Sequence, residues 1–228
     1  MLHVASRKVA FVASIYRHFE AFHLPYVRLL KAWGYDVHAY ARADESKIKL
    51  QQEGIVCHDM LLQRNPLRKE NVQTLGALTA SFRDEQFQLV HVHTPVASVL
   101  GRIAAKRAAV PYVLYTAHGF HFYKGAPVLN WLLYYPVERL MARSTDTLIT
   151  MNREDFRRAK RFPVRDRVVC VPGVGLEVEY YRSGDQDVRK RLGIDESAFV
   201  VLCVAELIAR KNQTQLIRAV KREVESGH

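Results

Sequence analysis

Cysteine is scarce in this chain, and the placement of the few cysteines excludes two kinds of site. The 228 residues include three, Cys57, Cys170 and Cys203, each inside a separate apolar run. Cysteines this far apart are typical of buried free thiols, and they exclude a disulfide framework or a zinc knuckle. We therefore expect a protein of the reducing cytosol.

Long hydrophobic runs are also missing. No apolar stretch approaches the roughly 20 residues that are needed to span a bilayer. The short apolar stretch VAFVASI near the start is followed by Arg17 and His18 and by no clear cleavage site. It predicts a first strand rather than a signal peptide. Any membrane contact is therefore expected to be peripheral, on the inner face of the plasma membrane.

Glycine is absent from ASIYRHFEAF, residues 13–22, which follows the first predicted strand. A dinucleotide fingerprint needs three glycines at this point of the fold, where the first strand turns into the first helix. This absence removes the main support for an oxidoreductase with a nicotinamide or flavin cofactor.

Acidic residues are outnumbered by basic ones. The chain has 34 Lys and Arg against 23 Asp and Glu, a formal charge of +11. This excess favours a polyanionic partner, which could be nucleic acid, anionic lipid or a phosphorylated small molecule. Because no helix-turn-helix, zinc-finger or RNA-binding signature occurs, a nucleic-acid partner would rest on charge alone, and we expect none.

Short runs rich in Val, Ile, Leu and Tyr predict eight buried strands, at 9–14, 35–41, 55–60, 89–94, 112–117, 146–151, 167–172 and 199–207. Helical periodicity separates most of them. Residues 20–34 carry an apolar stripe and end at Gly34, and Asn152 is placed to cap another helix. This alternation predicts an α/β fold, a Rossmann-like parallel sheet with helices on both faces.

Ligands of such sheets bind beyond the carboxyl ends of the strands. Several polar residues and one glycine fall there. They are Ser14 after the first strand, His93 and Thr94 after the fourth, and Thr116, His118 and Gly119 after the fifth.

Two short motifs, HVH at 91–93 and HGFH at 118–121, could together supply four imidazoles. Neither has a carboxylate or cysteine at ligand spacing, so we expect no metal site and interpret His91 as a satisfied or solvent-facing side chain. His118 differs because it follows a buried strand and precedes a glycine, where the backbone can approach a ligand. A functional role and a structural one both stay open for it.

The segment VLNWLLYYPVERLMA, residues 128–142, predicts a helix with an unusually aromatic start. Core packing would explain its apolar residues. The alternative is an interfacial surface that dips into lipid headgroups, with Lys124 alongside, but core packing is the favoured interpretation.

The last part of the chain predicts the start of a second domain. A polar turn at 192–199 separates residues 1–195 from 196–228, and the second part is too short for a usual domain, so we expect it to be truncated. After the strand predicted at 199–207, Arg210 and Lys211 precede a helix. Two interpretations of this basic turn stay open. It could bind an anion at the helix N-terminus, or its charges could simply be solvated.

Six segments carry a resemblance that covers nearly the whole chain in order and spacing. They are GYDVHAYAR, LVHVHTPVASVLGRIAAK, YTAHGFHFYKG, ERLMARSTDTLITMNREDFRRAK, VPGVGLE and VAELIARKNQ. Together they resemble the family 4 retaining glycosyltransferases of bacterial capsule and exopolysaccharide synthesis. The resemblance implies a GT-B architecture, in which two Rossmann-like domains face each other across a cleft. Residues 1–195 would be the acceptor-side domain.

The resemblance implies roles for particular residues. His118 in the family's H-G turn would be catalytic, facing the donor sugar and helping to set the reaction geometry, while Gly119 keeps the turn close. Ser14, His93 and Thr94 would lie on the substrate side of the cleft. His121 is expected to support the loop.

The second domain would carry the donor. Gly173 and Gly175 match the crossover into it and are counted with the substrate site, and Lys211 matches the basic residue that pairs with the donor diphosphate. Arg210 is a neighbour without so clear a counterpart. Many relatives carry a phosphate-binding arginine where this chain has Glu206. Lys211 is therefore the main residue expected to bind the donor diphosphate.

The implied function is transfer of a hexose from a nucleotide-sugar, expected to be a UDP-sugar, to a lipid-linked or polysaccharide acceptor. Transfer would retain the anomeric configuration and require no metal or cofactor beyond this co-substrate. The family's paired-glutamate motif would fall after His228, so these residues alone are expected not to catalyse transfer. The alternative is a non-catalytic half-domain that binds an acceptor or a partner.

Overall fold

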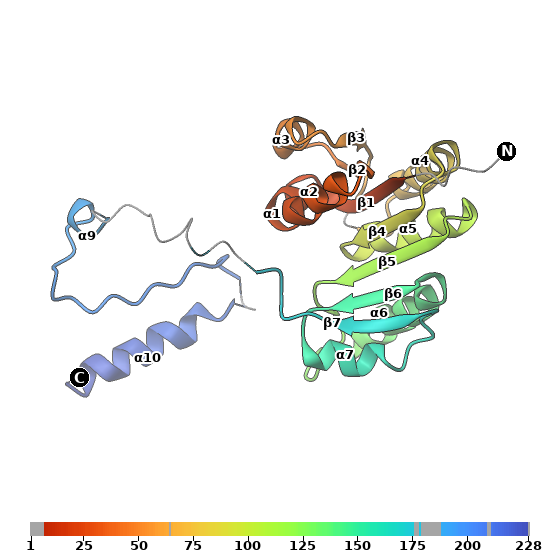
Figure 1. Cartoon of the computed structure of the whole chain (residues 1–228). Helices are drawn as coiled ribbons and strands as arrows, with labels where there is room; N and C mark the ends of the chain where they lie inside the picture. Colours follow the sequence, from red (N-terminus) through yellow and green to blue (C-terminus); the bar gives the residue numbers. More distant parts are fainter. Residues whose placement is uncertain (1–6, 64, 176–177, 179–187, 209–210, 228) are drawn as a thin grey trace. The chain divides into compact units, whose positions relative to one another are not determined.

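Seven strands form one parallel sheet in the order β3-β2-β1-β4-β5-β6-β7 (Figure 1). The computed structural model describes residues 7–63, 65–175, 178, 188–208 and 211–227. The strands are β1 Lys8–Ile15, β2 Asp36–Arg42, β3 Val56–Asp59, β4 Leu89–His93, β5 Tyr112–Ala117, β6 Thr147–Thr150 and β7 Arg167–Cys170. Seven predicted strands and the Rossmann-like fold class are thus confirmed.

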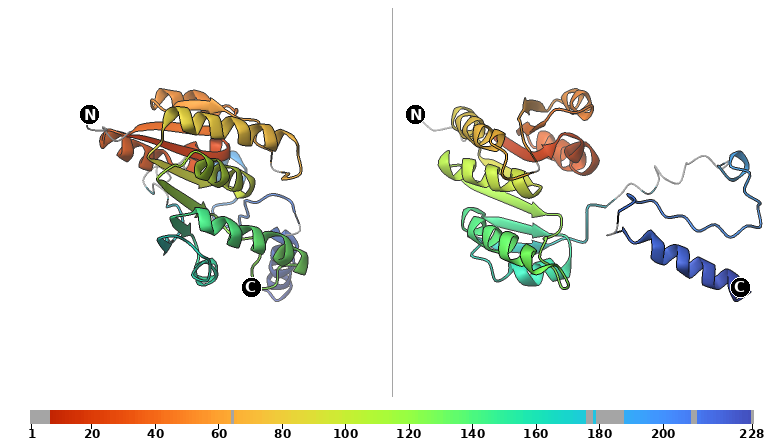
Figure 2. Two further views of the ribbon diagram at one scale, coloured as in Figure 1. Left: turned by 90° about the vertical axis from the view of Figure 1, so that its right-hand side faces the viewer. Right: turned by 180° about the vertical axis from the view of Figure 1, so that it is seen from behind.

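Helices cover both faces of this sheet. Those that precede β7 in the chain are α1 Arg17–Phe22, α2 Leu24–Ala32, α3 Ser46–Gln52, α4 Glu70–Glu85, α5 Pro95–Arg107, α6 Val128–Met141 and α7 Arg153–Ala159. One buried cluster joins α4, α5 and α7 to one face, with Trp131 and Tyr135 of α6 packed against it, and a second joins α1, α2 and α3 to the other. Helices α4, α5 and α6 lie in front of the sheet in the right-hand view of Figure 2.

The helix predicted over residues 20–34 is two helices, because the chain breaks at His23 between α1 and α2. Pro25 lies in the first turn of α2, where its missing N–H breaks no helical hydrogen bond. The buried residues of α2 are Leu24 and Val27, whereas Trp33 of the predicted stripe is 60% exposed. The break carries His23 into the interior, where it is 4% exposed.

The chain divides into two units, Met1–Gly175 and Leu176–His228, and the sheet belongs to the first. In the second, the structure describes α9 Val188–Arg191 and α10 Gln213–Glu225. The domain boundary near residue 195 stays a prediction.

The strand predicted at 199–207 is wrong, because these residues have no regular structure and Phe199 is 94% exposed. An apolar run becomes a strand only when a neighbouring strand pairs with it, and none does so within the described residues. As a consequence Cys203 is exposed and not buried as expected, while Cys57 and Cys170 are half-buried. All three are free thiols, as predicted.

In the part of the chain that the structure describes, we find no helix whose length and apolar character would let it cross a bilayer.

Candidate functional site

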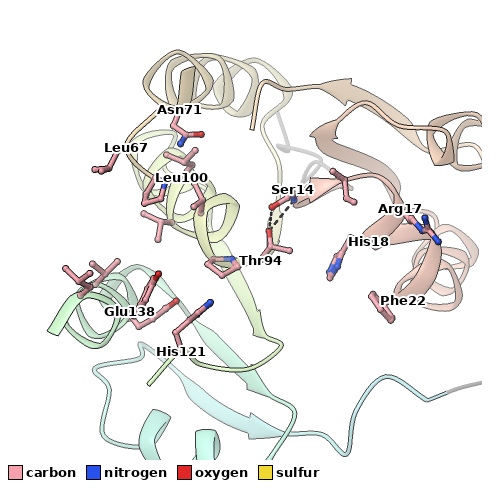
Figure 3. Close-up of a pocket in the computed structure, with 18 of the residues that line it drawn as sticks. Ser14, Arg17, His18, Phe22, Leu67, Asn71, Thr94, Leu100, His121 and Glu138 are labelled. Carbon is pink, nitrogen blue, oxygen red and sulfur yellow. Dashed lines mark hydrogen bonds between the residues drawn. The ribbon is translucent and has the colours of Figure 1, made fainter. Parts of the chain in front are cut away.

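A cleft of about 1170 Å³ opens at the carboxyl ends of β1 and β4 (Figure 3). Its floor includes Ser14, which is the last residue but one of β1, and Thr94, which directly follows β4. One wall is formed by the start of α1 and another by α6 and the loop after β5. The lining side chains are mainly apolar, among them Phe22, Leu67, Leu100, Leu133 and Val137. Such a cleft can hold a long apolar group while a few polar groups orient one end of it.

Ser14 and Thr94 contact each other at the floor. Their hydroxyl oxygens are 2.8 Å apart, and the Ser14 N–H donates to Thr94 Oγ1 at 3.2 Å. Thr94 has a φ of 58°, which a β-branched residue rarely adopts. Strained backbone of this kind persists where the surrounding structure holds it and is common at binding sites. The two hydroxyls can exchange hydrogen bonds with a ligand hydroxyl.

A buried charged network supports the α6 side of the cleft. Arg102 of α5 is 1% exposed and donates to Glu138 Oε2 at 3.0 Å, and Tyr115 donates to Glu138 Oε1 at 2.9 Å. The guanidinium also lies over the Tyr115 ring, 4.1 Å from its centroid. Burial raises the pKa of Tyr115, so the phenol stays a proton donor to the carboxylate. Glu138 lines the cleft but is already paired within the protein.

Five histidines gather beside the cleft. His18 lies in α1, His23 follows α1, His91 and His93 lie on β4, and His118 follows β5. The ring centroids of His18 and His118 are 4.7 Å apart, and those of His23 and His93 are 4.1 Å apart. His91 is satisfied by Thr116 at 2.8 Å, as its interpretation from sequence expected.

These imidazoles are neutral at neutral pH. Burial, together with repulsion from neighbouring imidazoles, lowers the pKa of His18 to about 4, of His23 to about 2 and of His91 to about 3. The same causes hold the pKa of His93 well below its usual value. His118 is exposed by surface area, yet its contacts with neighbouring rings remove enough water to lower its pKa as well.

The two histidines of the HGFH motif lie in different surroundings, and only His121 lines the cleft. His118 contacts the other histidines and does not line the cleft, although its neighbour His18 does. His121 lines the cleft, stacks on Tyr134 at 4.5 Å, and accepts a hydrogen bond from Asn130 through its backbone oxygen. Its backbone thus supports the loop while its ring faces the cleft. Gly119, with a φ of 144°, needs glycine's conformational freedom.

Other candidate residues lie away from this cleft. Gly173 and Gly175 have φ values of 90° and 74° in the segment that leaves β7, which only glycine adopts readily. Lys211 is exposed in the second unit, before α10. Arg210 lies outside the described residues. His93, predicted to bind substrate, is fully buried among other histidines and Phe11 and does not line the cleft.

Sequence reasoning missed the residues that α1 and α6 contribute. His18, Arg17 and Tyr134 line the cleft, but none directly follows a strand in the sequence. The one available signal was histidine itself, because His93 ends β4 and His118 directly follows β5.

A family model and two curated relatives all relate this chain to glycosyltransferases. The family described as glycosyl transferase 4-like matches residues 8–152. EpsD of Bacillus subtilis (strain 168), which is named as a glycosyltransferase, is 40% identical over 221 residues, covering 94% of this chain and 57% of EpsD. An Escherichia coli protein named UDP-Gal:alpha-D-GlcNAc-diphosphoundecaprenol alpha-1,3-galactosyltransferase is 31% identical over 174 residues, covering 73% of this chain and 44% of the relative. The chain therefore spans about half the length of these relatives.

The fold has a counterpart among solved structures. Sucrose-phosphate synthase from Thermosynechococcus elongatus aligns with a TM-score of 0.67 at 16% identity, over 94% of this chain and 59% of that one. At this identity the likeness concerns the fold alone.

Proposed function

The chain belongs to the glycosyl transferase 4-like family, and from this premise we propose that it supplies the acceptor side of a hexosyltransferase. The donor is a nucleotide-sugar, of which a UDP-sugar is the expected kind, and the acceptor is a lipid-linked sugar. The name of the Escherichia coli relative, which pairs UDP-Gal with an undecaprenyl diphosphate acceptor, supports both choices. No other cofactor is proposed.

The observation that carries this proposal is the composition of the cleft. Its apolar walls suit a lipid chain, and the hydroxyls of Ser14 and Thr94 at its floor suit the sugar that the lipid carries. Arg17 lines the same cleft and carries a positive charge that suits the linking diphosphate. One ligand with apolar, anionic and hydroxyl-bearing parts satisfies all three features.

The proposed reaction exchanges one bond at the anomeric carbon of the donor. An acceptor hydroxyl oxygen forms a bond to this carbon, and the bond to the diphosphate oxygen breaks with retention of configuration. The nucleoside diphosphate leaves with the electron pair and takes up the hydroxyl proton. His118, neutral beside His18, would hold a hydroxyl of the donor sugar, and Lys211 and Arg210 would contact the diphosphate.

A fusion protein tests the function directly. The chain is joined to the part of EpsD that lies beyond the match and is assayed with radiolabelled UDP-sugars and a short polyprenyl-diphosphate-linked sugar. We expect transfer by the fusion and none by the 228 residues alone. A fusion that folds but transfers from no donor to any polyprenyl acceptor would contradict the proposal.

Two histidine variants of the fusion test the assigned role. His118→Ala should lower kcat by roughly 10²- to 10⁴-fold, as expected for a positioned catalytic group. His121→Ala serves as the matched control because it lies in the same loop and faces the cleft. It should affect mainly the KM for the acceptor. An unchanged kcat for His118→Ala at saturating substrate would remove His118 from the mechanism.

We further propose that the protein works at the inner face of the plasma membrane and binds it through α6. None of the 14 residues of this helix is buried. Trp131 and Tyr135 pack against the core, while Leu129 and Leu132 are 62% and 67% exposed. Lys124 shortly precedes the helix, and an apolar face with a cation alongside it is typical of an interfacial helix.

Vesicle cosedimentation tests the membrane contact. The chain should bind vesicles containing anionic lipid more strongly than neutral ones, and salt should weaken the binding by screening the charges. Leu132→Asp should reduce binding because it places a charge on the face that enters the headgroups. Val72→Asp, at a position 74% exposed on α4, is the control. Equal binding of the two variants would show that α6 is not the contact.

A further inference from the structure

Four of the five histidines beside the cleft converge on one point. The four are His18, His23, His93 and His118. Each has one ring nitrogen that lies within 4.8 Å of a ring nitrogen of each of the other three. We propose that these four residues form a binding site for a borderline transition metal ion, Zn²⁺ or a chemically similar divalent ion. This inference goes beyond the proposed function, in which no metal takes part.

The spacing of the ring nitrogens fits such an ion. Zinc–imidazole bonds of about 2.0–2.1 Å in a tetrahedron place the ligand nitrogens roughly 3.4 Å apart. His23 Nε2 lies 3.0 and 3.1 Å from the two ring nitrogens of His93, and His118 Nε2 lies 3.4 Å from His93 Nδ1. Small rotations of the rings would therefore bring the nitrogens to coordination distance.

Hydrogen bonding among the histidines leaves part of the cluster unsatisfied. A neutral imidazole has one N–H and one lone pair, so each contact between two rings uses one of each. His18 Nε2 and His23 Nδ1 are buried without a hydrogen-bond partner. Unpaired buried polar atoms are uncommon and often mark a missing ion or water. An ion within the group would take the lone pair of His18 Nε2, whereas His23 faces the group with Nε2, so its Nδ1 lies outside the proposed site.

The donor set decides which ions fit. All four ligands are imidazoles, and no carboxylate or thiolate belongs to the group. Imidazole suits Zn²⁺, Co²⁺, Ni²⁺ and Cu²⁺, whereas Mg²⁺ and Ca²⁺ need oxygen ligands. His118 is exposed and His18 lines the cleft, so an ion can reach the group from solvent.

A second cluster, His38, His58 and Glu85, is a weaker candidate. It offers three ligands, and Glu85 is already paired with Lys8 at 2.7 Å. His38 and His58 stack on each other and are 2.9 Å apart between ring nitrogens, which satisfies one atom of each. This cluster supplies a matched control for the first one.

Cobalt spectroscopy on the untagged chain tests the proposal. Four-coordinate Co²⁺ absorbs visible light much more strongly than the hexaaqua ion, so a titration reports both affinity and geometry. We expect the wild type to develop the tetrahedral spectrum and Zn²⁺ to abolish it by displacement. Zn²⁺ should also raise the thermal midpoint, since it binds the folded state. A wild-type spectrum that stays octahedral would overturn the proposal whatever the variants do.

Variants locate the ion. His18→Gln and His118→Gln are chosen because both side chains are partly accessible, and circular dichroism checks their fold. Each should weaken Co²⁺ binding by at least about tenfold, since even residues that only support ligands cost 10- to 100-fold. His58→Gln and His121→Gln should leave binding unchanged. If a control weakens binding as much as His18→Gln and His118→Gln do, the metal lies elsewhere and the assignment is wrong.

Discussion

Replacing Arg102 by methionine should lower the free energy of unfolding of the first unit by about 3–5 kcal/mol. Arg102 is 1% exposed, so methionine keeps much of its buried volume and removes the charge. The change leaves the Glu138 carboxylate, whose side chain is 12% exposed, with Tyr115 as its remaining partner in this network. It also removes the bond from Arg102 Nε to the Ser98 carbonyl oxygen at 3.0 Å.

The size of the effect comes from the unpaired charge. Truncating one partner of a buried ion pair costs more than the pair contributes, because the other charge stays buried without compensation. For a unit of this size each kcal/mol lowers the thermal midpoint by about 2–4 °C, so a decrease of about 6–20 °C is expected. Urea unfolding followed by circular dichroism measures the free energy directly.

Two further variants separate this explanation from loss of packing. The double variant Arg102→Met with Glu138→Gln removes the stranded charge and should recover at least about 1 kcal/mol of the loss. Arg139→Met changes an exposed arginine on α6 and should stay within about 0.5 kcal/mol of wild type. If the double variant is no more stable than Arg102→Met alone, the unpaired Glu138 carboxylate is not the cause, and the reasoning fails.

Two other matched pairs follow from the packing. Gly101→Ala should destabilise the fold by about 1–3 kcal/mol, because its Cβ would lie 2.6 Å from Val92 Cγ1. Gly76→Ala, where nothing lies within 4 Å, should stabilise α4 by about 0.5–1 kcal/mol, and urea unfolding that moves both variants in one direction would refute the contrast. Iodoacetamide should modify the exposed Cys203 before Cys57, since burial raises the pKa of the Cys57 thiol to about 11 and leaves little thiolate at neutral pH. The rate at Cys57 should therefore keep rising with pH up to about that value, and peptide mass spectrometry that finds Cys57 modified first would contradict this order.

The sheet was predictable because its signal is local. Each of the seven strands is a short apolar run bounded by polar residues, which can be recognised without knowledge of the neighbouring strands. The run at 199–207 has the same local signal and forms no strand, because pairing depends on a second segment that the run itself does not contain. The break at His23 was equally hidden, since an early proline fits one long helix as well as the start of a second.

The cleft was predictable only where strand ends build it. The rule that parallel strands end at one edge places Ser14 and Thr94 together although 80 residues separate them. The rule says nothing about side chains that reach the same edge from helices, because their position depends on where each helix begins and how it crosses the sheet. His18 and His23 are of this second kind, and the contact of His23 with His93 spans 70 residues. The HVH and HGFH motifs, judged by spacing alone, therefore predicted no metal site, since two of the four converging imidazoles lie in a segment whose sequence carries only a helical pattern.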